Sequence, residues 1–239
     1  MKSSFFHFQQ FSVRQQDSAM KIGTDGVLLG AWTKLRAEDR VILDIGTGTG
    51  LIALMIAQRY PNTTLDAIEL NEAAALEAEF NFRNSPWPNR LNAFLTSVQD
   101  HALNARIKYD HIVCNPPFYQ GAYPFENSAR DKARNNAFLP FSELFQSINS
   151  LLNANASCSL IVPFAAFEKV IVEAEKNDLC LVRSTKVKGC EGASFKRVLL
   201  SFSRENKVPV ENELCLELSR NERTPAHQEL VKAFYLSKP

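Results

Sequence analysis

A continuous apolar strand that runs into a glycine-rich turn constrains this chain more than any other feature. Residues 41–43 are apolar without alternation, which predicts a strand buried on both faces of a parallel sheet. Residues 51–60 follow with apolar side chains at helical spacing. Between them lies a turn with a glycine at every second position and an acid two residues before the first: Asp44, Gly46, Gly48 and Gly50. A strand, a glycine turn and a helix in this order predict the first unit of a nucleotide-binding α/β fold.

A second strand is predicted over residues 63–69 and ends in Glu69, which follows Gly50 by 19 residues. Nucleotide-binding folds place a carboxylate about 20 residues beyond the glycines, on the ribose hydroxyls of the ligand. A carboxylate can accept two hydrogen bonds, which matches a vicinal diol. The alternative is a solvated Glu at a strand end, and the glycine turn upstream favours ribose binding.

The tetrapeptide Asn115-Pro116-Pro117-Phe118 follows a predicted strand over residues 109–114. Two prolines in succession make a stiff, extended exit from a strand. The Asn115 side-chain oxygen and the Pro116 carbonyl can each accept one N–H, and Phe118 can stack on a flat ring. This set suits a planar ligand that carries an amino group. A plain strand-to-loop turn with Phe118 as a core residue is the alternative that the tetrapeptide alone leaves open.

Strands and helices alternate along the chain, which predicts an α/β fold with a mostly parallel sheet and helices on both faces. Further strands are expected at 91–96, 158–163, 179–188 and 197–203, with an additional short one at 213–218. Further helices are expected at 26–32, capped by Thr24 or Asp25, and at 71–84, 139–152, 165–177 and 224–236. We expect one domain over 1–239, made of an N-terminal arm and helix (1–38), a core (39–205) and a C-terminal strand and helix (206–239).

The composition excludes several classes of protein. The chain has 239 residues, a net charge of +1 and 45% hydrophobic residues, so a basic surface for nucleic acid would have to be local. Its five cysteines include no Cys-x-x-Cys pair, which argues against disulfide frameworks and zinc ribbons, and no metal site is expected. No apolar run approaches the roughly 20 residues of a membrane span. We expect a cytoplasmic monomer with no membrane association.

Basic residues gather in two places. Three of them alternate in a long irregular segment after the tetrapeptide, and four flank the glycine-bearing stretch 189–196. Either set could meet the phosphates of RNA, although a solvated charge run is an alternative. The two sets are Arg130, Lys132 and Arg134, and Lys186, Lys188, Lys196 and Arg197.

With these motifs the sequence resembles the class I S-adenosylmethionine-dependent methyltransferases, and most closely the bacterial tRNA (adenine-N6)-methyltransferases that modify adenosine 37 of a valine tRNA. The resemblance covers nearly the whole chain and is most specific over residues 20–32 (MKIGTDGVLLGAW). It implies a Rossmann-like seven-stranded sheet whose last strand is antiparallel. It also implies transfer of the methyl group of S-adenosylmethionine to the N6 amine of an adenosine in tRNA.

The resemblance also implies roles for residues. The catalytic motif is Asn115, Pro116, Pro117 and Phe118, and the cofactor residues are Asp44, Gly46, Gly48, Gly50, Glu69, Lys21, Thr24, Asp25, Ser97 and Val98. One position departs from the family, which usually has an acid where this chain has Ser97. Either Ser97 makes a weaker contact with the cofactor adenine, or Asp100 replaces it, or backbone groups make the contact.

Three other functions share some of these motifs. The tetrapeptide also occurs in guanine-N2 methyltransferases of ribosomal RNA and in protein glutamine-N5 methyltransferases, but the segment 20–32 argues against both. A catalytically silent RNA-binding module is disfavoured because the tetrapeptide is intact. An NAD(P) oxidoreductase is disfavoured by the G-x-G-x-G spacing of the turn, which differs from the dinucleotide fingerprint.

Overall fold

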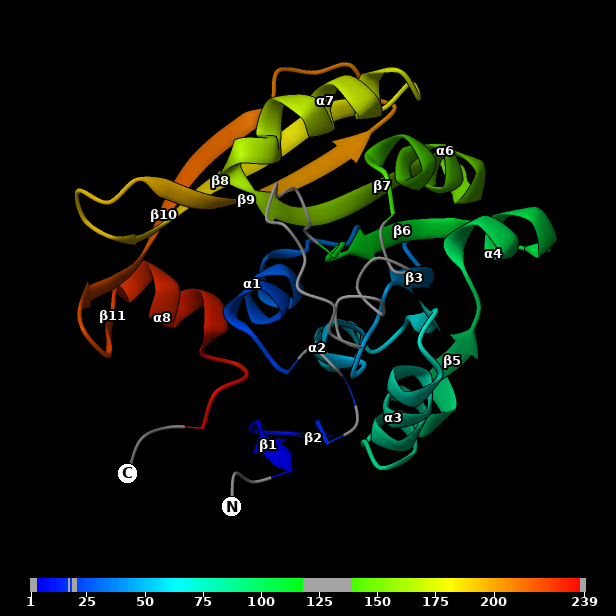
Figure 1. Cartoon of the computed structure of the whole chain (residues 1–239), viewed down its shortest axis with the longest axis horizontal. Helices are drawn as coiled ribbons and strands as arrows, with labels where there is room; N and C mark the ends of the chain where they lie inside the picture. Colours follow the sequence, from blue (N-terminus) through cyan, green and yellow to red (C-terminus); the bar gives the residue numbers. More distant parts are fainter. Residues whose placement is uncertain (1–3, 17, 19–20, 118–138, 237–239) are drawn as a thin grey trace, which may run out of the picture.

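A computed structural model of the chain describes residues 4–16, 18, 21–117 and 139–236. Its main sheet joins distant parts of the sequence side by side (Figure 1). The strand order across this sheet is β11 (Glu222–Arg223), β10 (Val210–Ser219), β8 (Cys180–Cys190), β9 (Phe195–Ser203), β7 (Leu152–Pro163), β6 (Tyr109–Cys114), β3 (Val41–Ile45), β4 (Thr64–Glu69) and β5 (Leu91–Leu95).

The expected fold class is confirmed, with seven core strands of which the last, β9, is antiparallel to both neighbours. The pairs from β5 through β4, β3 and β6 to β7 are all parallel. The sheet is wider than the expected seven strands, because β10 pairs in parallel with β8 and β11 pairs antiparallel with β10. The expected short strand at 213–218 is thus a strand of 10 residues with a partner on each side.

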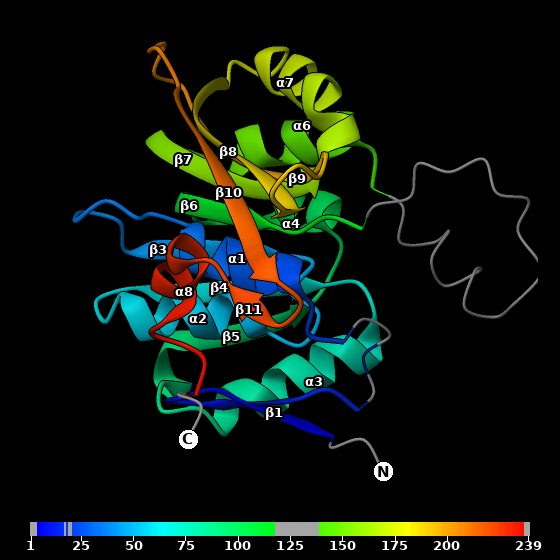
Figure 2. The ribbon, with the colours of Figure 1, turned by 90° about the vertical axis from the view of Figure 1, so that its left-hand side faces the viewer.

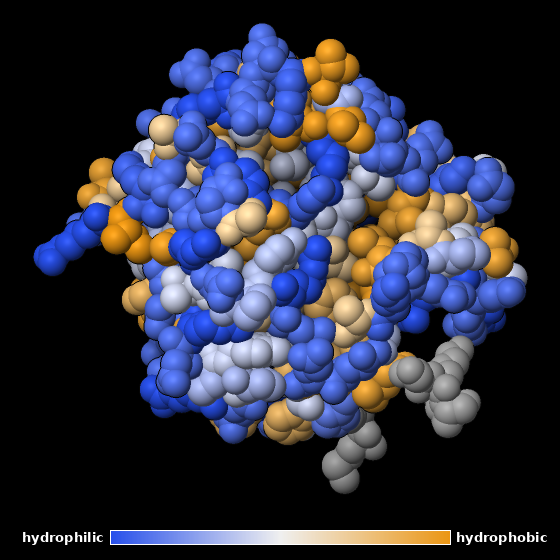
Figure 3. All heavy atoms as spheres, turned by 180° about the vertical axis from the view of Figure 1, so that it is seen from behind, coloured by the Kyte–Doolittle hydropathy of each residue, from blue (hydrophilic) through white to orange (hydrophobic). Residues whose placement is uncertain are grey.

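Helices cover both faces of the sheet, each over its own apolar cluster (Figure 1). One cluster lies under α1 (Thr24–Trp32), α2 (Leu51–Arg59), α3 (Glu72–Arg83) and α8 (Pro225–Val231). The other lies under α4 (Val98–Asn104), α6 (Phe141–Leu151) and α7 (Phe167–Glu175). Short 3-10 turns precede β5 (η1, Pro88–Arg90) and follow β7 (η2, Phe164–Ala166). The face opposite to Figure 1 is mostly hydrophilic, with scattered apolar residues (Figure 3).

An N-terminal hairpin, β1 (Phe5–His7) and β2 (Ser12–Arg14), packs beside the C-terminal end of the chain (Figure 2). The Gln9 amide donates to the carbonyls of Lys232 and Tyr235, and the Gln9 N–H donates to the carbonyl of Phe234. These contacts hold the expected arm against the end of the chain.

Two helices differ clearly from their expected bounds, and a third was not expected. The first begins at Thr24, with Gly23 rather than Thr24 or Asp25 as its N-cap. The last ends at Val231 instead of residue 236, and its N-cap Thr224 accepts the N–H of His227. Helix α4 was not expected, because the polar residues at its start were interpreted as ligand contacts.

Candidate active site

Three strand ends meet at one edge of the sheet. The register pairs Ile45 at the end of β3 with Ile68 on one side and with Cys114 on the other. The glycine turn therefore lies between Glu69 and Asn115, which directly follow these neighbours. Ligands of open α/β sheets bind outside the carboxyl ends of the strands, so this edge is the candidate site.

The glycines of the turn serve two different purposes. Gly46 and Gly48 adopt φ of +68° and +56°, and a Cβ built on either would meet no described atom within 4 Å. Gly50 has φ of +82°, but a Cβ there would lie 2.5 Å from Cε1 of Phe82 on α3. Positive φ favours glycine at all three positions. The first two leave backbone open to a ligand, whereas the third lets α3 pack against the turn.

Asp44 lies beneath the turn and is fully buried. Its Oδ2 accepts the hydroxyl of Thr47 at 2.6 Å, and its Oδ1 has no partner among the described residues. Burial raises the pKa of Asp44 to about 7, against the opposing effect of the Thr47 hydrogen bond. Asp44 was expected at the cofactor, and in the structure its described hydrogen bond supports the turn from within.

Glu69 is oriented by three backbone N–H groups. Its Oε2 accepts from Gly48 at 2.9 Å, and its Oε1 accepts from Leu70 and Asn71, each at 2.9 Å. A carboxylate has about four acceptor positions, so one remains, on Oε2. The glycine turn and the end of β4 thus fix each other, and Glu69 has less free capacity than the sequence suggested.

Asn115 and the prolines extend β6 beyond its last residue. Pro116 is buried, while Asn115 and Pro117 are half-buried. The side-chain Oδ1 of Asn115 is itself buried and has no hydrogen-bond partner among the described residues. A buried acceptor without a partner is costly, by about 1–3 kcal/mol, unless a ligand supplies the donor. Phe118, the last residue of the motif, lies outside the described residues.

Residues 11–133 match the methyltransferase small domain family. The chain is 43% identical to a tRNA1(Val) (adenine(37)-N6)-methyltransferase of Flavobacterium psychrophilum, over 97% of this chain and 99% of that protein. A protein of the same description from Photorhabdus laumondii is 38% identical, over 97% of this chain and 95% of the other. The chain belongs to the tRNA1(Val) (adenine(37)-N6)-methyltransferase family.

Solved structures agree on the fold. A crystal structure of a predicted O-methyltransferase from Agrobacterium tumefaciens superposes with a TM-score of 0.67, at 17% identity, over 88% of this chain and 96% of that chain. A geranyl diphosphate C-methyltransferase from Streptomyces coelicolor superposes with a TM-score of 0.53, at 12% identity, over 75% of this chain and 76% of that one.

The position where the sequence departs from its methyltransferase family is occupied by a helix cap. The Ser97 hydroxyl donates to Oδ2 of Asp100 at 2.6 Å and accepts the Asp100 N–H at 3.0 Å. Such a pair stabilises the start of a helix, here α4. Val98 packs in the core and is 5% exposed. The side chains of Ser97 and Asp100 therefore bond to each other, and a contact of either with the cofactor adenine stays a prediction.

The structure brings together two residues that the sequence assigned to different partners. Asp25, expected at the cofactor, accepts from Nε of Arg197, expected at the RNA, at 2.8 Å. Thr24 is exposed at the start of α1, and Lys21 donates its ammonium to the carbonyls of Gln15 and Gln16. The methyltransferase family segment 20–32 is thus tied to β9 at one point and to the preceding loop at another.

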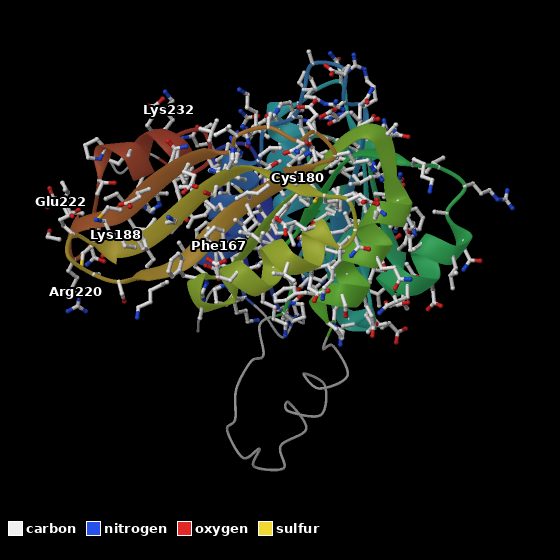
Figure 4. All side chains as sticks on the ribbon, turned by 90° about the horizontal axis from the view of Figure 1, so that it is seen from above. Phe167, Cys180, Lys188, Arg220, Glu222 and Lys232 are labelled. Carbon is white, nitrogen blue, oxygen red and sulfur yellow. The ribbon has the colours of Figure 1, made fainter. Side chains whose placement is uncertain are left out.

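The expected basic cluster is largely paired with acids. Lys186 lies 3.5 Å from a carboxylate oxygen of Glu211, and Lys188 lies 2.8 Å from one of Glu191. Lys188 lies at the same end of the sheet as Arg220 and Glu222 (Figure 4). Lys196 is exposed. The other expected basic residues, Arg130, Lys132 and Arg134, lie outside the described residues.

Leu70 was missed by the sequence reasoning. Its side chain is 54% exposed although it directly follows Glu69 at the carboxyl edge of the sheet. The sequence did indicate this exposure, because an apolar residue at the end of a buried strand next to the expected ribose carboxylate has no core to enter.

Among the described residues no group of acids, histidines and cysteines could hold a metal ion, and no helix is long and apolar enough to cross a membrane.

Proposed function

We propose that the protein transfers a methyl group from S-adenosylmethionine to the N6 amine of adenosine 37 in tRNA1(Val). The support for the substrate is the similarity to curated relatives of that description over almost the whole chain. The support for the chemistry is local, and it comes from the edge of the sheet.

The observation that carries the proposal is the Oδ1 of Asn115, which is buried and has no hydrogen-bond partner in the part of the chain that the structure describes. The exocyclic amine of adenine has two hydrogens to donate, and Asn115 Oδ1 and the Pro116 carbonyl oxygen offer two acceptors on consecutive residues. Hydrogen bonds to both would hold the nitrogen in a tetrahedral, electron-rich geometry. They would also stabilise the positive charge that develops on the nitrogen during transfer.

The glycine turn fits the cofactor. The open faces of Gly46 and Gly48 and the remaining acceptor of Glu69 Oε2 suit an adenosyl group and one of its ribose hydroxyls. The exposed Leu70 side chain offers an apolar surface beside that carboxylate. When bound, S-adenosylmethionine supplies a methyl group on a positively charged sulfur, which is the electrophile.

The methyl transfer needs no dedicated base in the protein. The amine nitrogen forms a bond to the methyl carbon as the bond from that carbon to sulfur breaks. The resulting ammonium is acidic and releases one proton to water, so the chain has to supply alignment and acceptors rather than a proton acceptor. Alignment of amine, methyl and sulfur accounts for much of the rate in such reactions.

The target base must leave the stack of the anticodon loop before its amine can reach Asn115. We assign stacking on that base to Phe118 by the family motif, with a contribution of about 1–3 kcal/mol. Exposed basic residues such as Lys196 would meet phosphates of the same tRNA. We further propose that the protein acts as a cytoplasmic monomer.

Transfer of radiolabel from the cofactor tests the proposal. Purified protein should label bulk tRNA from cells that lack this modification, and nucleoside analysis should find the label on adenosine. Label on guanosine would favour a guanine-N2 enzyme, and label on protein would favour a glutamine enzyme; either result would contradict the proposal.

A further inference from the structure

The side chain of Glu77 is buried in the middle of α3, where the proposed reaction does not use it. The residue is 2% exposed and lies on an alanine-rich helix whose other buried positions are mostly apolar. A buried carboxylate is costly unless it is paired and hydrogen-bonded. Its partners therefore indicate what it is for.

Glu77 contacts the end of the N-terminal hairpin and the segment that leads from the hairpin to α1. The Gln16 N–H donates to Glu77 Oε1 at 2.6 Å, and the Ser18 N–H donates to Oε2 at 2.9 Å. Nε of Arg14 lies 3.7 Å from Oε1. Glu77 thus fixes the backbone of this segment on the surface of α3.

Asn81, one helical turn further along α3, joins the same segment to the glycine turn. Its Oδ1 accepts the Arg14 N–H at 2.8 Å, and its Nδ2 donates to the carbonyls of Arg14 at 3.0 Å and of Thr49 at 2.8 Å. Asn81 is 1% exposed. Thr49 precedes Gly50, the glycine against which α3 packs.

Residues of this segment also form hydrogen bonds with one another. Lys21 donates to the carbonyls of Gln15 and Gln16, and the Ile22 N–H donates to Oε1 of Gln15 at 2.9 Å. Gly23 then caps α1. In the first turn of α1, a Cβ on Gly26 would lie 3.1 Å from Leu51, the residue that follows the glycine turn. The segment is therefore linked to the glycine turn at one end through Asn81, and at its other end it leads into α1, which packs against the start of α2.

We propose that Glu77 and Asn81 are positioning residues for the methyl-donor site. They hold residues 14–16 and 18 against the glycine turn, and through Gln15 and Gln16 they set the place of Lys21 and of the first turn of α1. The inference rests on the proposed cofactor site at the turn. It assigns to α3 a role in cofactor binding although neither side chain faces the open side of Gly46 and Gly48.

Asp39 provides a matched control. It is also a buried carboxylate, 2% exposed, that accepts a backbone N–H and an arginine, both from Arg36. It precedes β3 and so lies at the opposite, amino edge of the sheet. Glu77→Gln and Asp39→Asn each replace one carboxylate oxygen by a donor, and both variants are expected to unfold at a lower temperature than wild type.

The measurement is the dissociation constant of S-adenosylhomocysteine for the full chain, by titration calorimetry at a temperature where each variant is folded. Glu77→Gln should weaken binding by about tenfold or more, the size expected for a lost hydrogen bond to a charged group. Asp39→Asn should stay within about twofold of wild type, because distant sites act independently. Equal loss of affinity in the two variants, or wild-type affinity in Glu77→Gln, would overturn the proposal.

Gln15→Ala keeps the test valid if Glu77→Gln does not fold. This half-buried side chain joins the segment to Ile22 without entering the core, and its removal should weaken cofactor binding in the same direction. Wild-type affinity in this variant counts against the proposal. A wild-type protein that binds S-adenosylhomocysteine but does not methylate tRNA would refute the proposed function and leave this comparison intact.

Discussion

Asn115 is the residue on which the proposed chemistry depends most directly. Its motif was recognisable from the sequence because two prolines after a strand permit few conformations. What the sequence left open was whether the asparagine oxygen would be used by the fold itself. In the structure it is buried and has no described partner, which favours a ligand as the missing donor.

Asn115→Ala should therefore lower kcat for tRNA methylation by about 10²–10³-fold, the usual loss when one oriented hydrogen-bonding group is removed from a transition state. Binding of S-adenosylhomocysteine should be unchanged. Steady-state kinetics and calorimetry on the same preparation check both expectations. Asn92→Ala, which removes an exposed asparagine that donates to Asp66, is the control and should keep wild-type kcat. A full kcat in Asn115→Ala would refute the acceptor argument.

Alanine substitutions at Gly48 and Gly192 distinguish the effect of backbone strain on stability from the effect of ligand contact on cofactor affinity. Both have positive φ, +56° and +76°, and a Cβ on either would meet no described atom within 4 Å. Alanine at either position should therefore destabilise the fold by a similar amount, about 1–2 kcal/mol. Only Gly48→Ala should also weaken cofactor binding, because only its open face lies at the site. Equal cofactor affinity in the two variants would contradict the assignment of the turn.

Asp44 and His111, on adjacent strands, give the stability of the protein opposing responses to pH. Burial raises the pKa of Asp44 from 3.8 to about 7, so the carboxyl stabilises the fold at low pH and this contribution is lost as pH rises to 7. His111 lies between the hydroxyls of Ser157 and Ser159, and burial lowers its pKa from 6.5 to about 3. Its contribution is present above pH 6.5 and is lost as pH falls toward 3.

Removing either group should expose the response of the other. Between pH 4 and 7, the free energy of unfolding of His111→Gln should fall with rising pH relative to wild type, and that of Asp44→Asn should rise. Urea denaturation at a series of pH values checks both slopes. Parallel curves for the two variants would show that the two groups do not titrate as described.

At the scale of elements, the sequence predicted a segment best where its residues suit only one structural role. Strand β3 was predictable from the unbroken apolar run at 41–43, and the turn after it from its glycines. Helix α4 was not predicted, although Ser97 and Asp100 have the spacing of a helix cap, because the same two side chains also suit a ligand. The ion pairs of Lys186 and Lys188 were not predictable, since their acids come from β10 and from the turn after β8.

Those ion pairs indicate which lysines are available to bind tRNA phosphates. Lys196→Gln should lower the dependence of log K on log[salt] for tRNA binding by about one unit, as for a lysine on a phosphate. Lys188→Gln should lower it less, because Lys188 already pairs with Glu191. Filter binding over a salt series provides the slopes. Equal slopes for wild type and Lys196→Gln would place the tRNA elsewhere.

At the scale of the whole molecule, the site is assembled from segments that are far apart in the sequence. The turn after β3 and the ends of β4 and β6 meet at one edge, while β10 and β11 widen the sheet beyond β8 (Figure 1). The resemblance implied a mostly parallel sheet with an antiparallel last strand, but no order for its strands. The parallel pairing of β10 with β8 and the docking of the N-terminal hairpin on Phe234 depend on long-range packing, which local sequence patterns do not encode.

The most direct test of the central claim is a comparison of two tRNA1(Val) transcripts, one with adenosine and one with guanosine at position 37. After incubation with the protein and S-adenosylmethionine, the nucleosides are analysed by mass spectrometry and the modified position is mapped. The account predicts N6-methyladenosine at position 37 of the first transcript and no methylation of the second. Equal methylation of the two transcripts, or a methyl group at another position of the first, would contradict it.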